Sequence, residues 1–297
     1  YLVVALGAEL APELIPNLAD IAHTPYSLSG AIQLRDALAD FRGGRVVVVI
    51  ASLPYKCPAA PYETALLLDS ALEQRGIQHR VEIFTPEGSP LPVAGPDIGK
   101  AVKEILTTRG IGFHPKVKLT AVNAASKELT FDDGTKTNFD FLVAVPPHRA
   151  PQLVRDAGLT DASGWIPVDK GTLKTSIANV FALGDVAAIR LPGRYSPDTP
   201  LMLPKAGVFA HAQAQVVASN IAAEISGQGM PTTWDGFGSC FLEIGAGQAG
   251  FAAGNFYAEP APRVDLHTPR AWWHWGKVLF EKEWLAAGLR QRFLRAG

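Results

Sequence analysis

The sequence holds few of the residues on which several protein classes depend. Two cysteines among 297 residues exclude a disulfide-scaffold protein. Charged residues make up 19% of the chain, and 27 basic against 28 acidic residues leave a net charge of -1, which offers no attraction for nucleic acid. No window approaches eighteen uninterrupted apolar residues, so no transmembrane helix is predicted. The histidines show no metal-ligand spacing with either cysteine, and no metal site is predicted.

Glycine is absent from Arg45 to Arg75, where its absence is most informative. The apolar run after Arg45 predicts a buried strand of a parallel sheet, and the segment from Glu63 has apolar residues at helical spacing. Strand, tight loop and helix open a dinucleotide-binding unit, in which glycines let the backbone approach a pyrophosphate. Here the loop carries Cys57 instead. Locally, the pattern predicts a dinucleotide-type fold that does not bind NAD at this loop.

Periodicity along the rest of the chain predicts an α/β protein. Residues 41–148 are expected to form one α/β unit, which contains a small antiparallel meander with a turn at Asp133-Gly134. The other expected elements are a buried strand at 2–8 that ends at Gly7, a helix at 29–41 with Ser29 as its cap, a strand at 80–86, a helix at 97–109, a strand at 180–183, a helix at 206–225, Gly-rich strands near 238–257 and an aromatic tail at 272–293.

Cys57 is the candidate nucleophile. Its neighbour Lys56 and the start of the helix near Glu63 both favour the thiolate, and Pro54 and Pro58 stiffen the loop. The alternative is a buried structural thiol. The second cysteine, Cys240, lies 240 − 57 = 183 residues downstream, so a bond between the two is neither predicted nor excluded.

Two further positions place polar groups at strand ends. Gly184-Asp185 follows an apolar strand, where a carboxylate can accept a hydrogen bond from a cofactor sugar; the alternative is a simple turn. His148, in PPHRAP, ends another strand and is a candidate for proton transfer, with an exposed loop histidine as the alternative.

Six segments together resemble the sulfide:quinone oxidoreductase and flavocytochrome c sulfide dehydrogenase family. They are VVALGAEL, PYKCPAAPYE, PPHRAP, NVFALGDVAAI, LPKAGVFAHAQAQVVASNI and GSCFLEIG, in this order. The resemblance covers nearly the whole chain and implies two Rossmann-like domains, FAD in the first and no NAD in the second, with a small C-terminal α+β segment. Residues 1–40 and 149–227 would belong to the FAD-binding domain, 41–148 to the second domain, and 228–297 to an interface or membrane-contact segment.

The resemblance also implies roles for single residues. Cys57 and Cys240 match two redox cysteines that accept sulfide sulfur as a disulfide or polysulfide and pass two electrons to the flavin. Lys205 would stabilise negative charge on reduced flavin. Leu6 stands where the family has a threonine, so the hydrogen bond of that threonine is absent. The positions that match FAD contacts are Gly7, Pro54, Gly184, Asp185, Val186, Pro204, Lys205, Ala206 and Gly207.

The expected function is FAD-dependent oxidation of sulfide or a related sulfur compound, with electrons passed to a quinone or a cytochrome. Two alternatives remain open: an NADH dehydrogenase-like flavoprotein of the same superfamily, and a non-catalytic interaction module. The tail at 272–293, which includes Arg290 and Arg292, predicts a helix that lies on a membrane surface, or else a core or homodimer-interface helix.

The chain begins on an apolar run at Tyr1 without a methionine. This predicts a piece of a longer protein, with the first Gly-rich FAD unit upstream. Any export signal would lie there too, so the compartment is left open.

Overall fold

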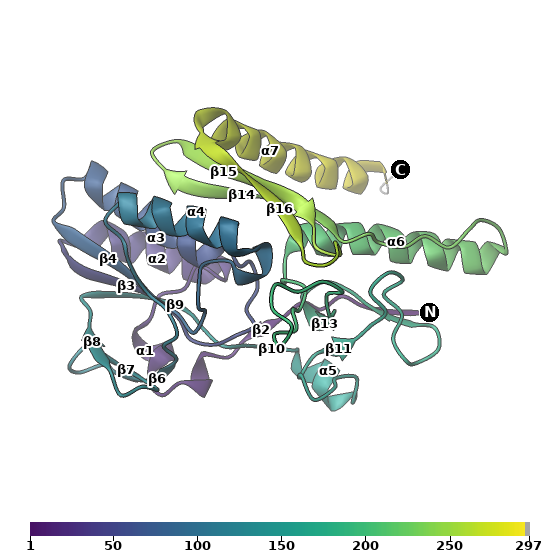
Figure 1. Ribbon diagram of the computed structural model, residues 1–297, viewed down its shortest axis with the longest axis horizontal. Helices are drawn as coiled ribbons and strands as arrows, with labels where there is room; N and C mark the ends of the chain where they lie inside the picture. The colour runs from purple at the N-terminus through teal and green to yellow at the C-terminus, as the bar shows by residue number, and fades with distance from the viewer. Residues whose placement is uncertain (295–297) are drawn as a thin grey trace.

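A four-stranded parallel sheet with the order β5-β4-β3-β9 is the main sheet of the first half of the chain, and its strands β3, β4 and β9 are seen on the left of Figure 1. The computed structural model describes the backbone of residues 1–294 and the side chains through residue 286. The side chains of Arg290 and Arg292 therefore lie outside the described residues. The predicted α/β class is confirmed, and the four strands of this sheet lie within residues 41–148, whereas one of its covering helices, at residues 28–40, precedes that range. The strands are β3 (Gly44–Ile50), β4 (His79–Phe84), β5 (Gly112–His114) and β9 (Phe141–Val145), and the helices on one face are α2 (Leu28–Asp40), α3 (Ala60–Gln74) and α4 (Pro96–Thr108).

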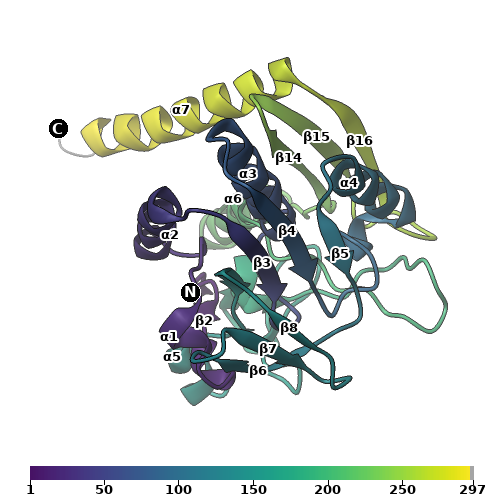
Figure 2. The same ribbon diagram turned by 90° about the vertical axis from the view of Figure 1, so that its left-hand side faces the viewer.

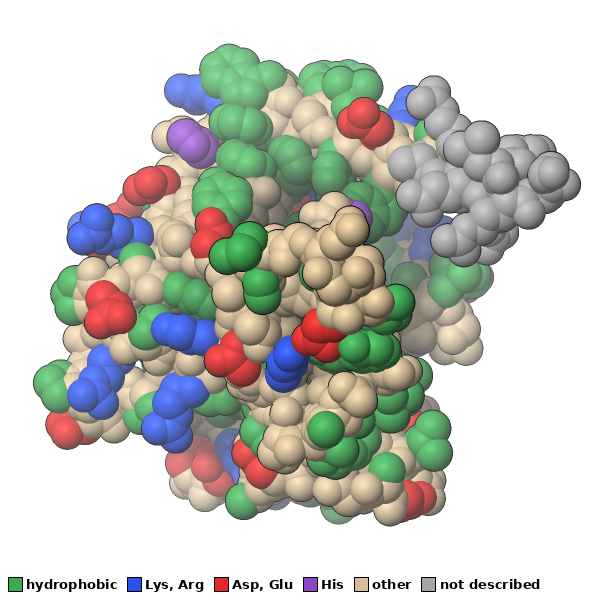
Figure 3. Space-filling view, turned by 90° about the vertical axis from the view of Figure 1, so that its right-hand side faces the viewer, with side chains coloured by type: hydrophobic (Ala, Val, Ile, Leu, Met, Phe, Trp, Pro, Cys, Tyr) green, Lys and Arg blue, Asp and Glu red, His purple; other side chains and the backbone are tan. Residues whose placement is uncertain are grey.

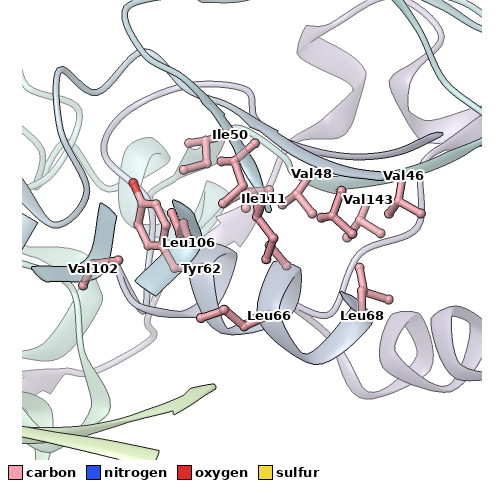
Figure 4. Close-up of a cluster of buried hydrophobic side chains, with 14 of the residues drawn as sticks. Val46, Val48, Ile50, Tyr62, Leu66, Leu68, Val102, Leu106, Ile111 and Val143 are labelled. Atoms are coloured by element: carbon pink, nitrogen blue, oxygen red, sulfur yellow. The ribbon is translucent and has the colours of Figure 1, made fainter. Parts of the chain in front are cut away.

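Strand β3 is buried on both faces. Val46, Val48 and Ile50 pack toward the helices (Figure 4). Val47 and Val49 pack toward the opposite side of the sheet, and all five are fully buried. This explains why the sequence shows a continuous apolar run rather than an alternation, since neither face meets water.

The opposite face of the sheet is covered by the predicted antiparallel meander. Leu119, Leu129 and Phe131 of the meander pack with Phe84 and with Leu18 of a short helix. The meander is therefore confirmed and completes a second core. Its elements are β6 (Leu119–Asn123), β7 (Glu128–Phe131) and β8 (Lys136–Asn138), and the short helix is α1 (Leu18–Ile21).

The C-terminal segment forms a second sheet that lies over α3 and α4 (Figure 2). Its antiparallel strands are β14 (Phe237–Gly245), β15 (Gln248–Asn255) and β16 (Arg263–Arg270), and α7 (Ala271–Leu294) lies across them (Figure 1). A Cβ atom at Gly254 would lie 2.0 Å from the carbonyl oxygen of Arg263. The close backbone approach predicted for this Gly-rich segment is therefore confirmed.

Short strand pairs join the beginning of the chain to its middle. Strand β1 pairs in parallel with β12, and β2 pairs with β10. The long helix α6 (Gly207–Ser226) follows, one residue later than predicted. The remaining elements are β1 (Leu2–Val4), β2 (Glu9–Leu10), η1 (Pro12–Leu14), η2 (Pro92–Ala94), β10 (His148–Arg149), α5 (Gln152–Asp156), β11 (Ile166–Pro167), β12 (Val180–Ala182), η3 (Gly184–Val186) and β13 (Ala187–Ala188).

Two local predictions are wrong. The expected buried strand at residues 2–8 is only the three-residue β1, whose Leu2 and Val3 are exposed because β12 is its single partner strand. The cap of α2 is Ser27 rather than Ser29: the Ser27 side chain accepts a hydrogen bond from the backbone N–H of Gly30 at 3.1 Å. Ser27 and Ser29 both come before the apolar residues of α2, so the sequence does not show which of them caps the helix. The backbone conformation identifies Ser27.

Candidate functional site

Two adjoining cavities lie where the loop after β3 meets α6 and the C-terminal sheet. The first, here called the thiol cavity, has a volume of about 290 Å³. Cys57 and Cys240 both border it, among side chains that are mostly aliphatic or aromatic. The structure thus brings together the two cysteines that lie 183 residues apart in the sequence. The surrounding apolar residues include Leu91, Val93, Ile98, Val102, Met202, Leu203, Val208, Phe209, Phe256, Val264 and Leu266.

The second cavity, here called the polar cavity, has a volume of about 380 Å³. Charged side chains from three parts of the chain border it: Lys56, Glu63, Asp185 and Lys205. Cys57 and Lys205 border both cavities. Cys57 therefore stands at the boundary between an apolar compartment and a charged one.

Backbone contacts fix Cys57 in this position. Its N–H donates to the carbonyl oxygen of Lys205 at 2.7 Å, and its carbonyl oxygen accepts from the N–H of Ala60 at the start of α3 at 2.9 Å. Its φ is 54°, in the left-handed region that glycine normally occupies. The thiol and the lysine of the two cavities are thus joined through a single main-chain hydrogen bond.

Both thiols hold their protons more tightly than an ordinary cysteine. Burial, followed by the charge of Glu63, raises the pKa of Cys57 to about 11, although the N–H of Ala60 and the cation of Lys277 lower it. Burial, followed by the charges of Cys57 and Glu63, raises the pKa of Cys240 to about 12. Each cysteine is exposed as a residue, yet the surrounding protein desolvates its thiol. The expectation that Lys56 and the helix start make Cys57 a thiolate is therefore wrong, because burial and Glu63 outweigh the helix start.

Lys205 is a buried cation at the junction of the cavities. Its ammonium donates to the carbonyl oxygens of Asp185 at 2.5 Å and Ala187 at 3.3 Å, and lies 3.5 Å from the centre of the Trp165 ring. Burial lowers the pKa of Lys205 to about 8, against the attraction of Asp185. Burial raises the pKa of Asp185, against the attraction of Lys205 and Lys56.

The polar cavity has features that suit a flavin cofactor. Gly207 borders this cavity, and a Cβ atom there would meet nothing within 4 Å; Gly7 also has open space beside it but borders neither cavity. Gly207 begins the twenty-residue helix α6, and no side chain caps its N-terminus. The positive end of the helix dipole and Lys205 therefore both favour negative charge at this cavity. The residues present fit FAD, which becomes anionic on reduction.

The other residues matched to FAD contacts are spread around the two cavities. Gly184 has φ 71° and its N–H donates to Gln213 Oε1 at 2.8 Å, which places Asp185 at the polar cavity. Pro54, Pro204 and Ala206 border the thiol cavity. Val186 is fully buried in a core cluster and borders neither cavity.

His148 lies outside both cavities. It is buried, its Nδ1 bonds the carbonyl oxygen of Pro146 at 2.8 Å, and its ring packs edge-on against Tyr26. Burial lowers the pKa of His148 to about 4, helped by the charges of Lys56 and Lys205, so the ring is neutral near pH 7. Because Nδ1 donates to a carbonyl, Nε2 is a buried acceptor without a partner in the structure. The interpretation of His148 as an exposed loop residue is wrong; proton transfer stays a prediction.

A buried carboxyl closes the place where a dinucleotide enzyme binds ribose. Glu87 follows β4, near the strand end at which such enzymes carry an acidic residue for the ribose hydroxyls. Here its carboxyl accepts hydrogen bonds from the hydroxyls of Tyr55 at 3.1 Å, of Thr85 at 3.2 Å and of Tyr62. Burial raises the pKa of Glu87, and the three hydroxyls oppose this. Protein hydroxyls therefore occupy the acceptors that a ribose would need.

Three charged residues near the thiols escaped the sequence analysis. Glu63 borders the polar cavity, Glu243 follows Cys240 on β14, and Lys277 reaches both carboxylates from α7. The sequence held one signal for the two carboxylates: Glu63 and Glu243 are acidic residues in otherwise apolar segments. Glu63 comes six residues after Cys57, and Glu243 three residues after Cys240. Within the described residues, no cluster of three or more potential metal ligands occurs.

Helix α7 has one face on the sheet and one in solvent. Trp273 stacks on Phe251 of β15 with ring centres 4.7 Å apart, whereas Trp272, Trp275 and Leu279 on the outer face are exposed. Hydrophobic side chains also gather at the height of this layer in the space-filling view of the right-hand side (Figure 3). In the described part of the chain, no helix has the length and apolar character needed to cross a bilayer. The exposed outer stripe leaves the membrane-surface contact and the homodimer interface both as predictions.

Comparisons with known proteins agree with this architecture. The family model described as pyridine nucleotide-disulphide oxidoreductase matches residues 59–215. The mitochondrial sulfide:quinone oxidoreductase of Mus musculus is 25% identical over 272 residues, which cover 88% of this chain and 58% of that protein. The sulfide-quinone reductase of Aquifex aeolicus is 26% identical over 304 residues, which cover 96% of this chain and 68% of that protein.

A solved structure shows the same fold. The X-ray structure of the sulfide:quinone oxidoreductase from Aquifex aeolicus superposes with a TM-score of 0.81 at 24% identity, covering 96% of this chain and 68% of that one. The chain spans 58% and 57% of the mouse and Schizosaccharomyces pombe relatives. The family match extends over more than half of the chain and contains Lys205, Asp185 and the helix that follows Cys57. The chain belongs to the pyridine nucleotide-disulphide oxidoreductase family.

Proposed function

We propose that this chain carries the thiol centre of a flavin-dependent enzyme that oxidises sulfide or a related sulfur compound. The observation that carries the proposal is the position of Cys57, which borders both the apolar cavity that it shares with Cys240 and the charged cavity that contains Lys205. The relatives named sulfide:quinone oxidoreductase support sulfide as the substrate.

The residues proposed to hold FAD are those of the polar cavity and its approach: Gly7, Gly184, Asp185, Lys205 and Gly207. FAD bound there would supply a two-electron acceptor next to Cys57. The Lys205 ammonium and the uncapped N-terminus of α6 would stabilise the negative charge that accompanies reduction. In this proposal the FAD-binding part lies within residues 1–40 and 149–227, with α1 and α2 of the first range packed on the sheet of residues 41–148, which carries the thiol loop.

The thiols would work as an exchanging pair. When Cys57 and Cys240 are joined as a disulfide, hydrosulfide attacks one sulfur, a new S–S bond forms on that cysteine as a persulfide, and the other cysteine leaves as a thiolate that carries the electron pair. That thiolate is a strong electron donor because its surroundings favour the protonated thiol. The apolar lining keeps water away from the persulfide.

For the electron acceptor we propose a quinone. The wall of the thiol cavity next to the C-terminal sheet is apolar and includes Val264 and Leu266, which suits an apolar ring better than the charged surface of a cytochrome. The exposed stripe of α7 would bring this side of the molecule to a membrane surface, where quinones reside. The alternative, reduction by NADH, is not supported at Glu87. The hydroxyls of Tyr55 and Tyr62 bond the carboxyl oxygens that would otherwise accept the ribose hydroxyls of NADH.

The test is flavin reduction in the FAD-loaded protein. Sulfide is expected to bleach the flavin absorbance and NADH is not. Cys57→Ser and Cys240→Ser are each expected to slow bleaching by sulfide at least 100-fold while flavin content is unchanged. Full bleaching by sulfide in Cys57→Ser would refute the thiol role, and bleaching by NADH alone would favour the dehydrogenase alternative. Absence of flavin absorbance in a protein that also carries the upstream FAD unit would favour the interaction module.

A further inference from the structure

A network of four charged or titratable side chains lies behind the two thiols. Glu63 Oε1 accepts from the backbone N–H of Glu243 at 2.8 Å and lies 3.5 Å from the Lys277 ammonium. The Nδ1 atom of His274 lies 3.0 Å and 3.1 Å from the two carboxylate oxygens of Glu243. Lys277 also lies 3.8 Å from Glu243. The network joins α3, β14 and α7 and takes no part in the proposed exchange.

This network connects the two segments that carry the thiols. Glu63 belongs to the helix that follows Cys57, and Glu243 belongs to the strand that contains Cys240. The carboxylates of Glu63 and Glu243 share one lysine, Lys277. The closer Lys277 lies to Glu63, the more it offsets the effect of the Glu63 charge on the two sulfurs. At both thiols the charge of Glu63 raises the pKa and the charge of Lys277 lowers it.

His274 contacts one of the two carboxylates that compete for Lys277. Its ring nitrogen engages both oxygens of Glu243, which leaves Lys277 closer to Glu63 than to Glu243. Without that ring, Lys277 becomes the one side-chain partner of Glu243 in the network and is drawn off Glu63. We propose that His274 is a positioning residue, which through Glu243 holds Lys277 against Glu63 and so makes both thiols easier to deprotonate.

Three other charged groups, Asp185, Lys56 and Lys205, share the polar cavity with Glu63. Asp185 also raises the pKa of Cys57. None of these three contacts the network on α7. Ionisation of either thiol releases one proton to solvent and transfers no electron, so the effect can be measured without sulfide or flavin. The inference bears on the proposed function, yet the two can fail separately.

The experiment measures the rate at which iodoacetamide alkylates each cysteine, followed by mass spectrometry from pH 7.5 to 9.5. In this range the rate follows the thiolate fraction, so a pKa change of half a unit to one unit alters it about three- to tenfold. Lys277→Met is expected to slow alkylation of both thiols by about that factor at every pH. His274→Leu is expected to slow it in the same direction, about twofold or more, and Glu63→Gln to accelerate it.

Two conservative variants and one control separate positioning from a structural role. His274→Asn retains an N–H donor near the place of Nδ1, and Lys277→Arg retains the cation, so both are expected to keep the normal rates. Lys282→Met removes an exposed lysine of the same helix and is expected to change nothing. Rates in folded Lys277→Met and His274→Leu that equal those of Lys282→Met would overturn the proposal. A lower melting temperature with unchanged alkylation would assign the network to stability alone and overturn it equally.

Discussion

Replacement of Tyr62 by phenylalanine tests whether the tyrosine hydroxyl stabilises the buried carboxyl of Glu87, which follows β4. Glu87 is almost fully buried, and hydroxyl groups rather than a cation oppose its desolvation. A hydrogen bond to a charged group contributes about 1.5–3 kcal/mol, so Tyr62→Phe is expected to lower the free energy of unfolding by about 2 kcal/mol at pH 8. Urea denaturation followed by circular dichroism measures this loss.

The same variant has a pH signature. The pKa of Glu87 is raised in the folded protein, so between about 4.5 and that raised value the folded state binds more protons than the unfolded state, and stability falls as the pH rises. Tyr62 lowers this pKa, so its removal raises it further and extends the fall to higher pH. The cost of Tyr62→Phe is therefore expected to be smaller at pH 5 than at pH 8.

Tyr195→Phe is the matched control. The Tyr195 hydroxyl donates to the neutral carbonyl oxygen of Pro262 at 2.8 Å, so its loss is expected to cost about 1 kcal/mol at both pH values. Equal costs for Tyr62→Phe and Tyr195→Phe, without dependence on pH, would refute the view that Tyr62 stabilises an ionised Glu87.

Three further outcomes are expected. At pH 7.5, iodoacetamide should alkylate Cys57 on the order of 100-fold more slowly than free cysteine, because a pKa of about 11 leaves little thiolate; equal rates would contradict the burial argument. Gly238→Ala should cost about 1–3 kcal/mol in urea denaturation, since its Cβ would lie 2.1 Å from the Phe209 ring; an unchanged midpoint would show that the ring moves freely. Trp272→Ser with Trp275→Ser should weaken sedimentation with anionic lipid vesicles at least tenfold, whereas unchanged sedimentation would favour the homodimer interpretation of α7.

Local sequence patterns predicted the strands and helices but not which residues meet at the site. The apolar run of β3 and the helical spacing of α3 depend on neighbouring residues, so the sequence alone revealed them. The proximity of Cys57 and Cys240 depends on how β14 packs on α3, which no local pattern encodes. The thiol pKa was predicted with the wrong sign because Lys56 is adjacent in sequence, whereas burial and Glu63 act through the folded structure. The family resemblance identified Lys205 as a site residue, whereas its contact with Trp165 could be found only in the folded structure.

The positive backbone angle of Cys57 places strain in the loop that carries the thiol. A non-glycine residue held at φ 54° costs on the order of 1–2 kcal/mol, which glycine at the same position would not incur. The segment from Arg45 to Arg75 contains no glycine, and yet the conformation that favours glycine persists at the thiol. Mutation to glycine would therefore be the stabilising change here. The strain at Cys57 is therefore the cost of holding a side chain, and with it the thiol, at a backbone position where glycine would be relaxed.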